Sequence, residues 1–307
     1  MAGRRAFVYW RPGRLRQSRV VPGLLSQGIS SLRWPRRLLL CFHAVDETWP
    51  NPSLSVPPPR FERFLDALLQ AGYRGATFGD VTHNGGRDRL VAITFDDAYT
   101  SVQRVAAPLL DELGWPGTVF VPTAPLVDGT PLYWVGSDIQ ALHPEATAQL
   151  GWDQLSELAG RGWEVGSHSR THRLLSRLDD GELAHELAGS REEIAAAVGE
   201  CNSVSYPWGE VDARVVAAAQ RTGYTAGSGL AGRFVWGDDL RVPRVAVAGN
   251  DGPGRFALKS SRVFWTLRRT PLWDAAESAR GLRGARDTDG ATPARKIARK
   301  LGFRGRT

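Results

Sequence analysis

The sequence predicts an α/β fold, specifically an irregular (β/α) barrel of seven or eight strands. From Leu38 onward, short apolar runs alternate with longer segments of helical periodicity, an order typical of parallel strands joined by helices. Several of the short runs end directly in polar residues, as expected where barrel strands deliver side chains to the loops at one end. Together these observations favour a barrel over a two-sheet sandwich.

The expected strands are the short apolar runs. Residues 38–43 (LLLCFH) and 90–95 (LVAITF) are the clearest, because they are almost wholly apolar and too short for a buried helix. Further strands are expected at 74–78, 117–121, 163–167, 204–206, 225–227 and 241–247.

The expected helices follow from apolar spacing and from their end signals. Residues 61–71 stop at Gly72, and residues 102–113 stop at Gly114. Residues 180–198 form the longest amphipathic segment, with Asp179 or Asp180 as its N-cap. Two more helices are expected at 152–159 and 213–221, and the proline-rich segment 46–59 is expected to be a loop.

Charge divides the 307-residue chain into three parts. The net charge of +7 combines +9 in residues 1–37, −12 in residues 38–254 and +10 in residues 255–307. We therefore expect a basic N-terminal extension, a folded domain over 38–254, and a basic C-terminal extension that is partly disordered. Basic ends favour an anionic partner such as a membrane surface, with solvated tails as the alternative. No motif for reading nucleic acid is present, so no specific nucleic-acid partner is expected.

The composition also bears on the compartment. Cys41 and Cys201 make neither a disulfide framework nor a zinc-ribbon spacing. No apolar stretch approaches the ~18 residues of a membrane span, and Pro12 and several arginines interrupt any secretory apolar core. A cytoplasmic location is expected, with peripheral attachment to a membrane as an option.

Two carboxylates stand at the end of a buried strand, in Thr94-Phe95-Asp96-Asp97. Burying both without a partner would be costly. Because the chain leaves the strand here, both side chains can approach one site, where one binds a metal and the other stays as a general base. The alternative is a solvated turn that caps the next helix.

Two histidines follow another predicted strand, in Ser167-His168-Ser169-Arg170-Thr171-His172. A spacing of four places both on one face of a helical turn, from which both imidazoles can reach one metal ion. Two histidines and one carboxylate leave positions open for water and substrate. Two surface histidines by chance are the alternative.

These two segments, about 70 residues apart, resemble the first two motifs of the polysaccharide deacetylase family, the NodB-homology group of carbohydrate esterases. The resemblance covers about residues 38–250. It implies that Asp97, His168 and His172 hold one divalent metal ion, usually Zn²⁺ in this family. It also implies that Asp96 is the general base that deprotonates the attacking water.

The third motif of the family, Arg-x-Pro-x-Gly, is altered here to Ser205-Tyr206-Pro207-Trp208-Gly209. In the family that arginine orients the base aspartate. Trp208 is expected to offer its backbone N–H to an oxyanion and its ring to the sugar site. Tyr206 and Pro207 are expected to contact substrate.

Two residues of the family, the third-motif arginine and the histidine of a late motif, have no match at the usual places in this sequence, so we look for replacements elsewhere in the chain. Arg241 and Arg244 are the candidates to replace the missing arginine, and Arg244 is also assigned to substrate binding. The late Leu-x-His motif has no match, because no histidine follows His185. His43 ends the first predicted strand, as in members with an N-terminal aromatic-His pair, and we assign it as the general acid.

The sequence thus predicts a metal-dependent hydrolase that removes N-acetyl or O-acetyl groups from a carbohydrate or glycan precursor. Trp134, Trp152 and Trp208 favour stacking against sugar rings. One alternative keeps the metal site and acts on a non-sugar amide or imide. The other is a carbohydrate-binding protein with weakened catalysis, which Ser205 in place of arginine would support.

Overall fold

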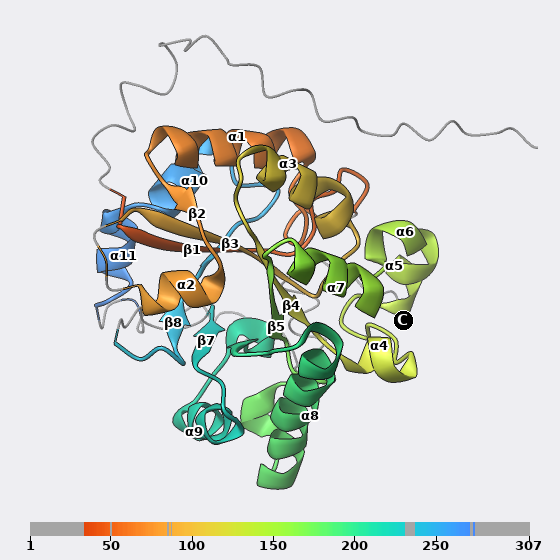
Figure 1. Ribbon diagram of the computed structural model, residues 1–307. Helices are drawn as coiled ribbons and strands as arrows, with labels where there is room; N and C mark the ends of the chain where they lie inside the picture. The colour runs from red at the N-terminus through yellow and green to blue at the C-terminus, as the bar shows by residue number, and fades with distance from the viewer. Residues whose placement is uncertain are drawn as a thin grey trace, which may run out of the picture.

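The computed structural model describes residues 34–273, except for Pro50, Gly85, Arg87, residues 231–236, and residues 271 and 272. Its strands pair in parallel in the order β8-β7-β6-β5-β4-β3-β1-β9, with β2 beside the start of β3 (Figure 1). The strands are β1 (Arg37–Phe42), β2 (Arg74–Gly75), β3 (Leu90–Asp96), β4 (Thr118–Val121), β5 (Glu164–Ser167), β6 (Ser203–Ser205), β7 (Ala226–Gly229), β8 (Val242–Pro243) and β9 (Val245–Ala246).

The sheet curls into a nearly closed barrel, and one short segment joins its two edges. β8 pairs with β7, whereas β9, one residue further along the chain, pairs with β1. Residues 242–246 therefore lie between the last long strand and the first. Arg244 is the single residue between the two paired stretches. The predicted (β/α) barrel is confirmed.

The helices lie mainly outside the barrel and bury its apolar outer face (Figure 1). The long helix α8 begins with a capping box in which the Asp179 side chain accepts from the Glu182 N–H, as the predicted N-cap requires. The helices are α1 (Pro58–Gln70), α2 (Phe78–His83), η1 (Val102–Ala106, a π-helix), α3 (Ala107–Glu112), α4 (Ala124–Asp128), α5 (Ser137–Leu142), α6 (Pro144–Thr147), α7 (Trp152–Gly160), η2 (Leu175–Arg177), α8 (Asp180–Val198), η3 (Pro207–Gly209), α9 (Ala213–Thr222), α10 (Pro253–Lys259) and α11 (Arg262–Leu267).

The barrel interior is apolar and tightly filled at the end where the strands begin. Phe120 packs there with Phe78 of α2, their ring centroids 5.2 Å apart. The Phe78 N–H donates to Oγ1 of Thr118, the first residue of β4, so α2 closes the end of the barrel where the strands begin. A Cβ at Gly166 would lie 2.6 Å from the Phe120 ring, which explains the glycine.

Two predicted strands are corrected, and three short helices were not predicted. The strand expected over 74–78 is only the two-residue β2, because Thr77 caps α2 through a bond from the Asp80 N–H. Helices α4 to α6 occupy the stretch between β4 and α7, where no periodicity predicted them. The strand expected over 241–247 is interrupted at Arg244.

The C-terminal boundary expected at residue 254 also lies too early. Helices α10 and α11 follow it, and Phe256 and Trp265 are buried in the main core. Phe256 stacks on Phe64 of α1 with ring centroids 4.2 Å apart. The N-terminal residues 1–33 and most of residues 271–307 lie outside the described part of the chain.

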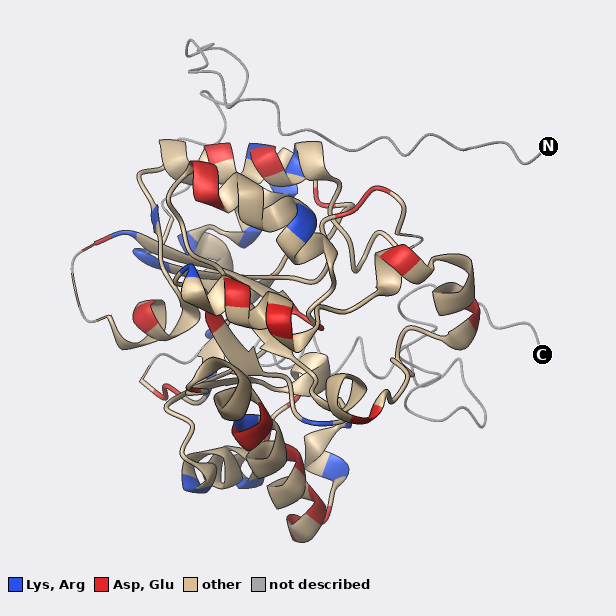
Figure 2. Cartoon of the chain, turned by 45° about the vertical axis from the view of Figure 1, so that its right-hand side comes forward, with Lys and Arg blue, Asp and Glu red and all other residues tan. Residues whose placement is uncertain are grey.

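Acidic residues of the middle segment are spread over the outer helices, including α1, α7 and α8 (Figure 2). Within the described residues, no helix is both long enough and apolar enough to cross a membrane.

Candidate active site

The adjacent Asp96 and Asp97 reach one site because the backbone turns between them. Asp96 is the last residue of β3, and the next two residues, Asp97 and Ala98, have positive φ of 70° and 55°. This left-handed turn breaks the strand alternation that would send neighbouring side chains to opposite faces. Both carboxyl groups are almost fully buried.

Asp97, His168 and His172 come together as the sequence predicted. The Asp97 Oδ1 atom lies 3.8 Å from Nε2 of His168 and 3.6 Å from Nε2 of His172. Donor atoms on a tetrahedral zinc ion are about 3.3 Å apart, so the three groups lie close to a ligand arrangement. Nδ1 of His168 donates to the Ser205 carbonyl (2.7 Å), which leaves Nε2 with its lone pair facing Asp97.

The chemistry of this trio fits a bound cation. Within the described part of the chain, the buried Asp97 Oδ1 has no hydrogen-bond partner, whereas Oδ2 accepts from the Tyr99 hydroxyl. Burial, together with the neighbouring Asp96, raises the pKa of Asp97 to about 6. Burial also lowers the pKa of His168 and His172, so both imidazoles stay neutral. A buried carboxylate aimed at two neutral imidazoles would be stabilised by a divalent ion.

The two histidines do not lie on a helical turn, contrary to the sequence expectation. Their loop contains positive φ at Ser169 (62°) and His172 (57°), and no helix is assigned there. Glu186 of α8 holds the loop, because its carboxylate accepts the N–H groups of Arg170 (2.9 Å) and Thr171 (2.8 Å). The His172 N–H donates to the Ser169 hydroxyl. The two histidines, four residues apart in sequence, are therefore brought together by a loop that α8 holds in place.

Asp96 is held by Arg244. The guanidinium donates from Nη1 to Oδ1 (2.7 Å) and from Nη2 to Oδ2 (2.8 Å), a bidentate pair with both partners buried. Ser205 adds a hydroxyl donor to Oδ2 at 3.1 Å. Burial alone would raise the pKa of Asp96, but the charge and the hydrogen bonds of Arg244 hold it far below its usual range. Asp96 is therefore ionised at neutral pH.

Barrel closure is what brings Arg244 to this position. The residue lies between β8 and β9, is 0% exposed, and extends across the interior. Its Nε donates to Ser228 and its Nη1 to Thr94, and the guanidinium lies 5.1 Å above the Phe120 ring. The other sequence candidate, Arg241, is exposed. Arg244 thus occupies the place left by the altered third motif, next to Ser205.

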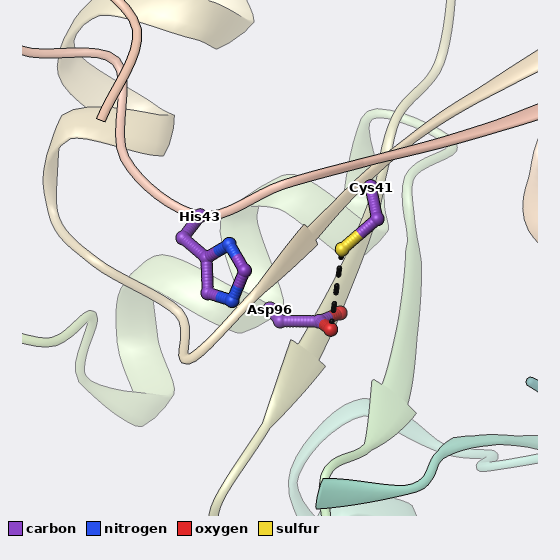
Figure 3. Close-up of side chains that lie close together, drawn as sticks. All are labelled: Cys41, His43 and Asp96. Atoms are coloured by element: carbon purple, nitrogen blue, oxygen red, sulfur yellow. Dashed lines mark hydrogen bonds between the residues drawn. The ribbon is translucent and has the colours of Figure 1, made fainter. Parts of the chain in front are cut away.

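His43 lies beside the Asp96 carboxylate, directly after β1, and is only partly buried (Figure 3). The ligand atoms of Cys41, His43 and Asp96 all lie within 4.8 Å of one another. This second group does not suit a cation, because both Asp96 oxygens already accept from Arg244. Burial also raises the pKa of Cys41, so the protonated thiol donates to Asp96 Oδ2 at 3.4 Å.

Aromatic side chains surround His172 above the buried trio. Trp134 stacks on the imidazole with ring centroids 4.1 Å apart, and Trp208 approaches it edge-on at 4.9 Å. The indole N–H of Trp208 and the hydroxyl of Tyr133 both donate to the His172 carbonyl. Trp134 and Trp208 are partly exposed at this rim, whereas Trp152 begins α7 and packs against the main core.

The Pro-Trp-Gly turn keeps a fixed shape. Trp208 has φ 63° and Gly209 has φ 71°, and a Cβ at Gly209 would lie 2.5 Å from Leu230. Tyr206 is fully buried and donates its hydroxyl to the Leu240 carbonyl, and Pro207 is buried as well. The substrate contacts expected of the Tyr206 and Arg244 side chains do not fit this burial, because neither faces solvent.

Two residues of the site, Glu186 and Cys41, were not predicted. Glu186 lies on the apolar face of α8 with Leu183 and Leu187. A carboxylate on a buried helix face indicates that a hydrogen-bond donor is buried beside it. Cys41 alternates with Leu39 and His43 along β1, which indicates an inward side chain. Trp134, one of the three tryptophans expected to stack on sugar rings, lies against His172.

The geometry places three side chains that could hold a metal ion beside an ionised carboxylate, at one end of a barrel. A family model described as polysaccharide deacetylase matches residues 83–227. YxkH of Bacillus subtilis (strain 168) is 27% identical over 195 residues, which is 62% of this chain and 62% of that protein. The chain thus resembles polysaccharide deacetylases over these residues.

Solved structures share the fold. The Streptococcus pyogenes deacetylase PplD, in complex with acetate, has a TM-score of 0.60 at 20% identity, over 73% of this chain and 98% of that one. IcaB from Ammonifex degensii has a TM-score of 0.59 at 22% identity, over 76% and 97% respectively. A polysaccharide deacetylase of Bacillus cereus, BC0361, matches with a TM-score of 0.59 at 22% identity, over 73% and 68%.

Proposed function

We propose that this protein is a metal-dependent deacetylase that removes N-acetyl or O-acetyl groups from a carbohydrate or glycan precursor. The observation that carries the proposal is the position of Asp96. Its Oδ2 atom lies 4.0 Å from Nε2 of His168, between the ligand trio and His43, and Arg244 keeps it ionised. A pure binding protein has no need of a base held in this way.

We infer that Asp97, His168 and His172 hold the ion, and that it is Zn²⁺. Two imidazoles and one carboxylate are a common ligand set for catalytic zinc. When bound, the cation supplies Lewis acidity to the acyl carbonyl. The remaining chemistry belongs to the side chains around it.

The residues around the trio divide the proton transfers between them. Asp96 accepts a proton from the attacking water, because it is the ionised carboxylate beside the ligands. His43 donates a proton to the leaving amine nitrogen or alkoxide oxygen, because it is the partly exposed imidazole beside Asp96. The backbone N–H of Trp208 stabilises the oxyanion, and its left-handed turn holds that group in place.

A saccharide substrate is supported by the partly exposed Trp134 and Trp208 at the rim, whose faces suit the apolar side of a sugar ring. The description of the matching family model supports the same substrate class, and the acetate complex of PplD supports acetate as the product. A non-sugar amide is the competing substrate, because the ligand trio and the base would serve any carbonyl of suitable size.

The test combines metal content with product release. Wild-type protein, loaded with Zn²⁺ under reducing conditions, is compared with Asp96→Asn and His168→Ala on N-acetylglucosamine oligomers and N-acetylated precursors. We expect stoichiometric metal and acetate release from the wild type. Asp96→Asn should keep the metal and lose activity, and His168→Ala should lose both. Absence of stoichiometric metal in the wild type would overturn the metal site, and metal without acetate release would favour a binder or a non-sugar substrate.

A further inference from the structure

Helices α10 and α11 expose aliphatic side chains next to arginines, on a surface that the proposed reaction does not use. Leu258 (47% exposed) lies in the last turn of α10, and Val263 and Leu267 (both 51%) lie one turn apart on α11. The opposite side of α11 is anchored, because Trp265 and Arg268 are buried. The apolar face is therefore presented by a helix that the core holds in place.

The same two helices carry positive charge. Residues 253–270 contain five arginines or lysines and no acidic residue. Arg255, Arg262 and Arg269 are exposed, and Arg255 also pairs with Asp251. The chain then continues into residues 274–307, which hold nine basic and four acidic residues. A cationic rim around exposed aliphatic groups is complementary to an anionic surface with an apolar layer beneath it.

We propose that the α10–α11 surface (Leu258, Val263 and Leu267, with Arg255, Arg262 and Arg269) docks the protein on an anionic lipid bilayer. The aliphatic side chains enter the headgroup boundary while the guanidinium groups meet lipid phosphates. A nucleic acid or an acidic polysaccharide would satisfy the arginines but leave the aliphatic groups in water. A bilayer satisfies both, which is why we choose it.

The location of this surface leaves the reaction site accessible. Figure 1 places α11 on the opposite side of the molecule from α5 and α6, which belong to the segment that carries Trp134 at the rim. Docking through α11 therefore does not cover that rim. The inference does not depend on the hydrolytic reaction, because none of its residues belongs to the site.

The test is co-sedimentation of the full chain with vesicles of phosphatidylcholine, alone or mixed with phosphatidylserine. We expect binding only to the mixed vesicles, weakening as salt is added. Val263→Asp with Leu267→Asp should weaken binding by at least about tenfold, because two apolar contacts are lost. The matched control, Val127→Asp with Leu142→Asp, makes the same charge change at exposed positions of α4 and α5 and should bind like the wild type.

The charge component is tested separately. Arg262→Gln with Arg269→Gln should weaken binding about 25-fold, from about fivefold per arginine at an anionic surface. The control Arg104→Gln with Arg221→Gln removes two exposed arginines elsewhere and should cause little change.

Three outcomes overturn the proposal. If Val263→Asp with Leu267→Asp binds the mixed vesicles as tightly as the wild type, the contact lies elsewhere in the chain. If the wild type binds heparin or RNA but no vesicle, the partner is a soluble polyanion. If light scattering shows a dimer that the same two substitutions dissociate, the surface belongs to a second copy. Acetate release from a soluble substrate should be unchanged in these variants, which separates docking from catalysis.

Discussion

Replacing Arg244 with methionine should destabilise the protein strongly at neutral pH. Methionine keeps much of the volume but removes five hydrogen bonds, two of them to the buried Asp96 carboxylate at 2.7 and 2.8 Å. Each bond to a charged group contributes about 1.5–3 kcal/mol. Removing one partner of a buried ion pair costs about 3–5 kcal/mol, because the other charge stays buried. We expect a loss of about 3–5 kcal/mol in the free energy of unfolding.

The sign of the pH dependence makes this prediction specific. In the wild type the pKa of Asp96 is lowered, so its contribution to stability is present above the unfolded pKa of about 3.9 and is lost as pH falls through the folded pKa. In Arg244→Met, burial is no longer offset, and the pKa of Asp96 rises. Protonation then relieves the buried charge in mild acid. The difference between variant and wild type should therefore shrink by up to about 1.4 kcal/mol per pH unit below the new pKa.

Urea unfolding of the metal-free protein at neutral pH and in mild acid measures both effects. Ser205→Ala is the matched control, since it removes one neutral donor to Asp96 and should cost about 1 kcal/mol. Combining Asp96→Asn with Arg244→Met should cost less than the two single losses added together. A loss below about 1 kcal/mol for Arg244→Met, or a loss that is the same at both pH values, would show that Arg244 does not offset a buried charge on Asp96.

Three further predictions concern the ion, the acid and the barrel interior. Burial raises the pKa of Asp97 to about 6, so a proton competes with Zn²⁺ for this carboxylate in mild acid. The Zn²⁺ affinity, measured by titration calorimetry with proton-release analysis, should therefore fall about tenfold per pH unit below pH ~6. An affinity that does not change with pH would exclude Asp97 as a ligand. His43→Ala should keep full metal content and lose about 10²–10⁴-fold in kcat, because the leaving group loses its proton donor. His83→Ala, at an exposed position, should match the wild type, and equal activity of both variants would remove His43 from catalysis. Gly166→Ala should lower the free energy of unfolding by about 1–3 kcal/mol, because the added methyl group meets the Phe120 ring inside the barrel. The methyl group of the control Gly160→Ala meets nothing within 4 Å, so this variant should unfold thermally almost like the wild type. Equal effects of the two substitutions would contradict this packing.

Much of the site could be predicted because it depends on where strands end. Asp96 and His168 follow apolar runs of the chain, and parallel strands deliver such residues to one end of a barrel. The backbone conformation next to these residues, at Asp97 and around His172, was less predictable. The left-handed turn at Asp97 and the loop around His172 depend on tertiary contacts, among them those of the Glu186 carboxylate. The spacing of apolar residues along the chain does not predict such contacts.

The choice between Arg241 and Arg244 illustrates the limit of sequence reasoning. Both lie in one short apolar segment, and their spacing of three does not tell which side chain points inward. The answer depends on how that segment pairs at each edge of the barrel, with β7 before Arg244 and with β1 after it. Helices α4 to α6 and α10 to α11 were missed for a related reason. Each has seven residues or fewer, too few to establish a helical period.

The site is completed across the seam of the barrel, and this links closure to the proposed chemistry. His43 follows β1, and Arg244 stands between β8 and β9, beside that same strand. Arg244 therefore reaches Asp96 only when the two-residue strand β9 pairs correctly with β1, whereas His43 is placed by the pairing of β1 with β3. Asp97 and the two histidines follow β3 and β5, which take no part in the pairing of β9 with β1. Weakening the seam should therefore remove Arg244, the partner of the base, while leaving metal affinity largely intact.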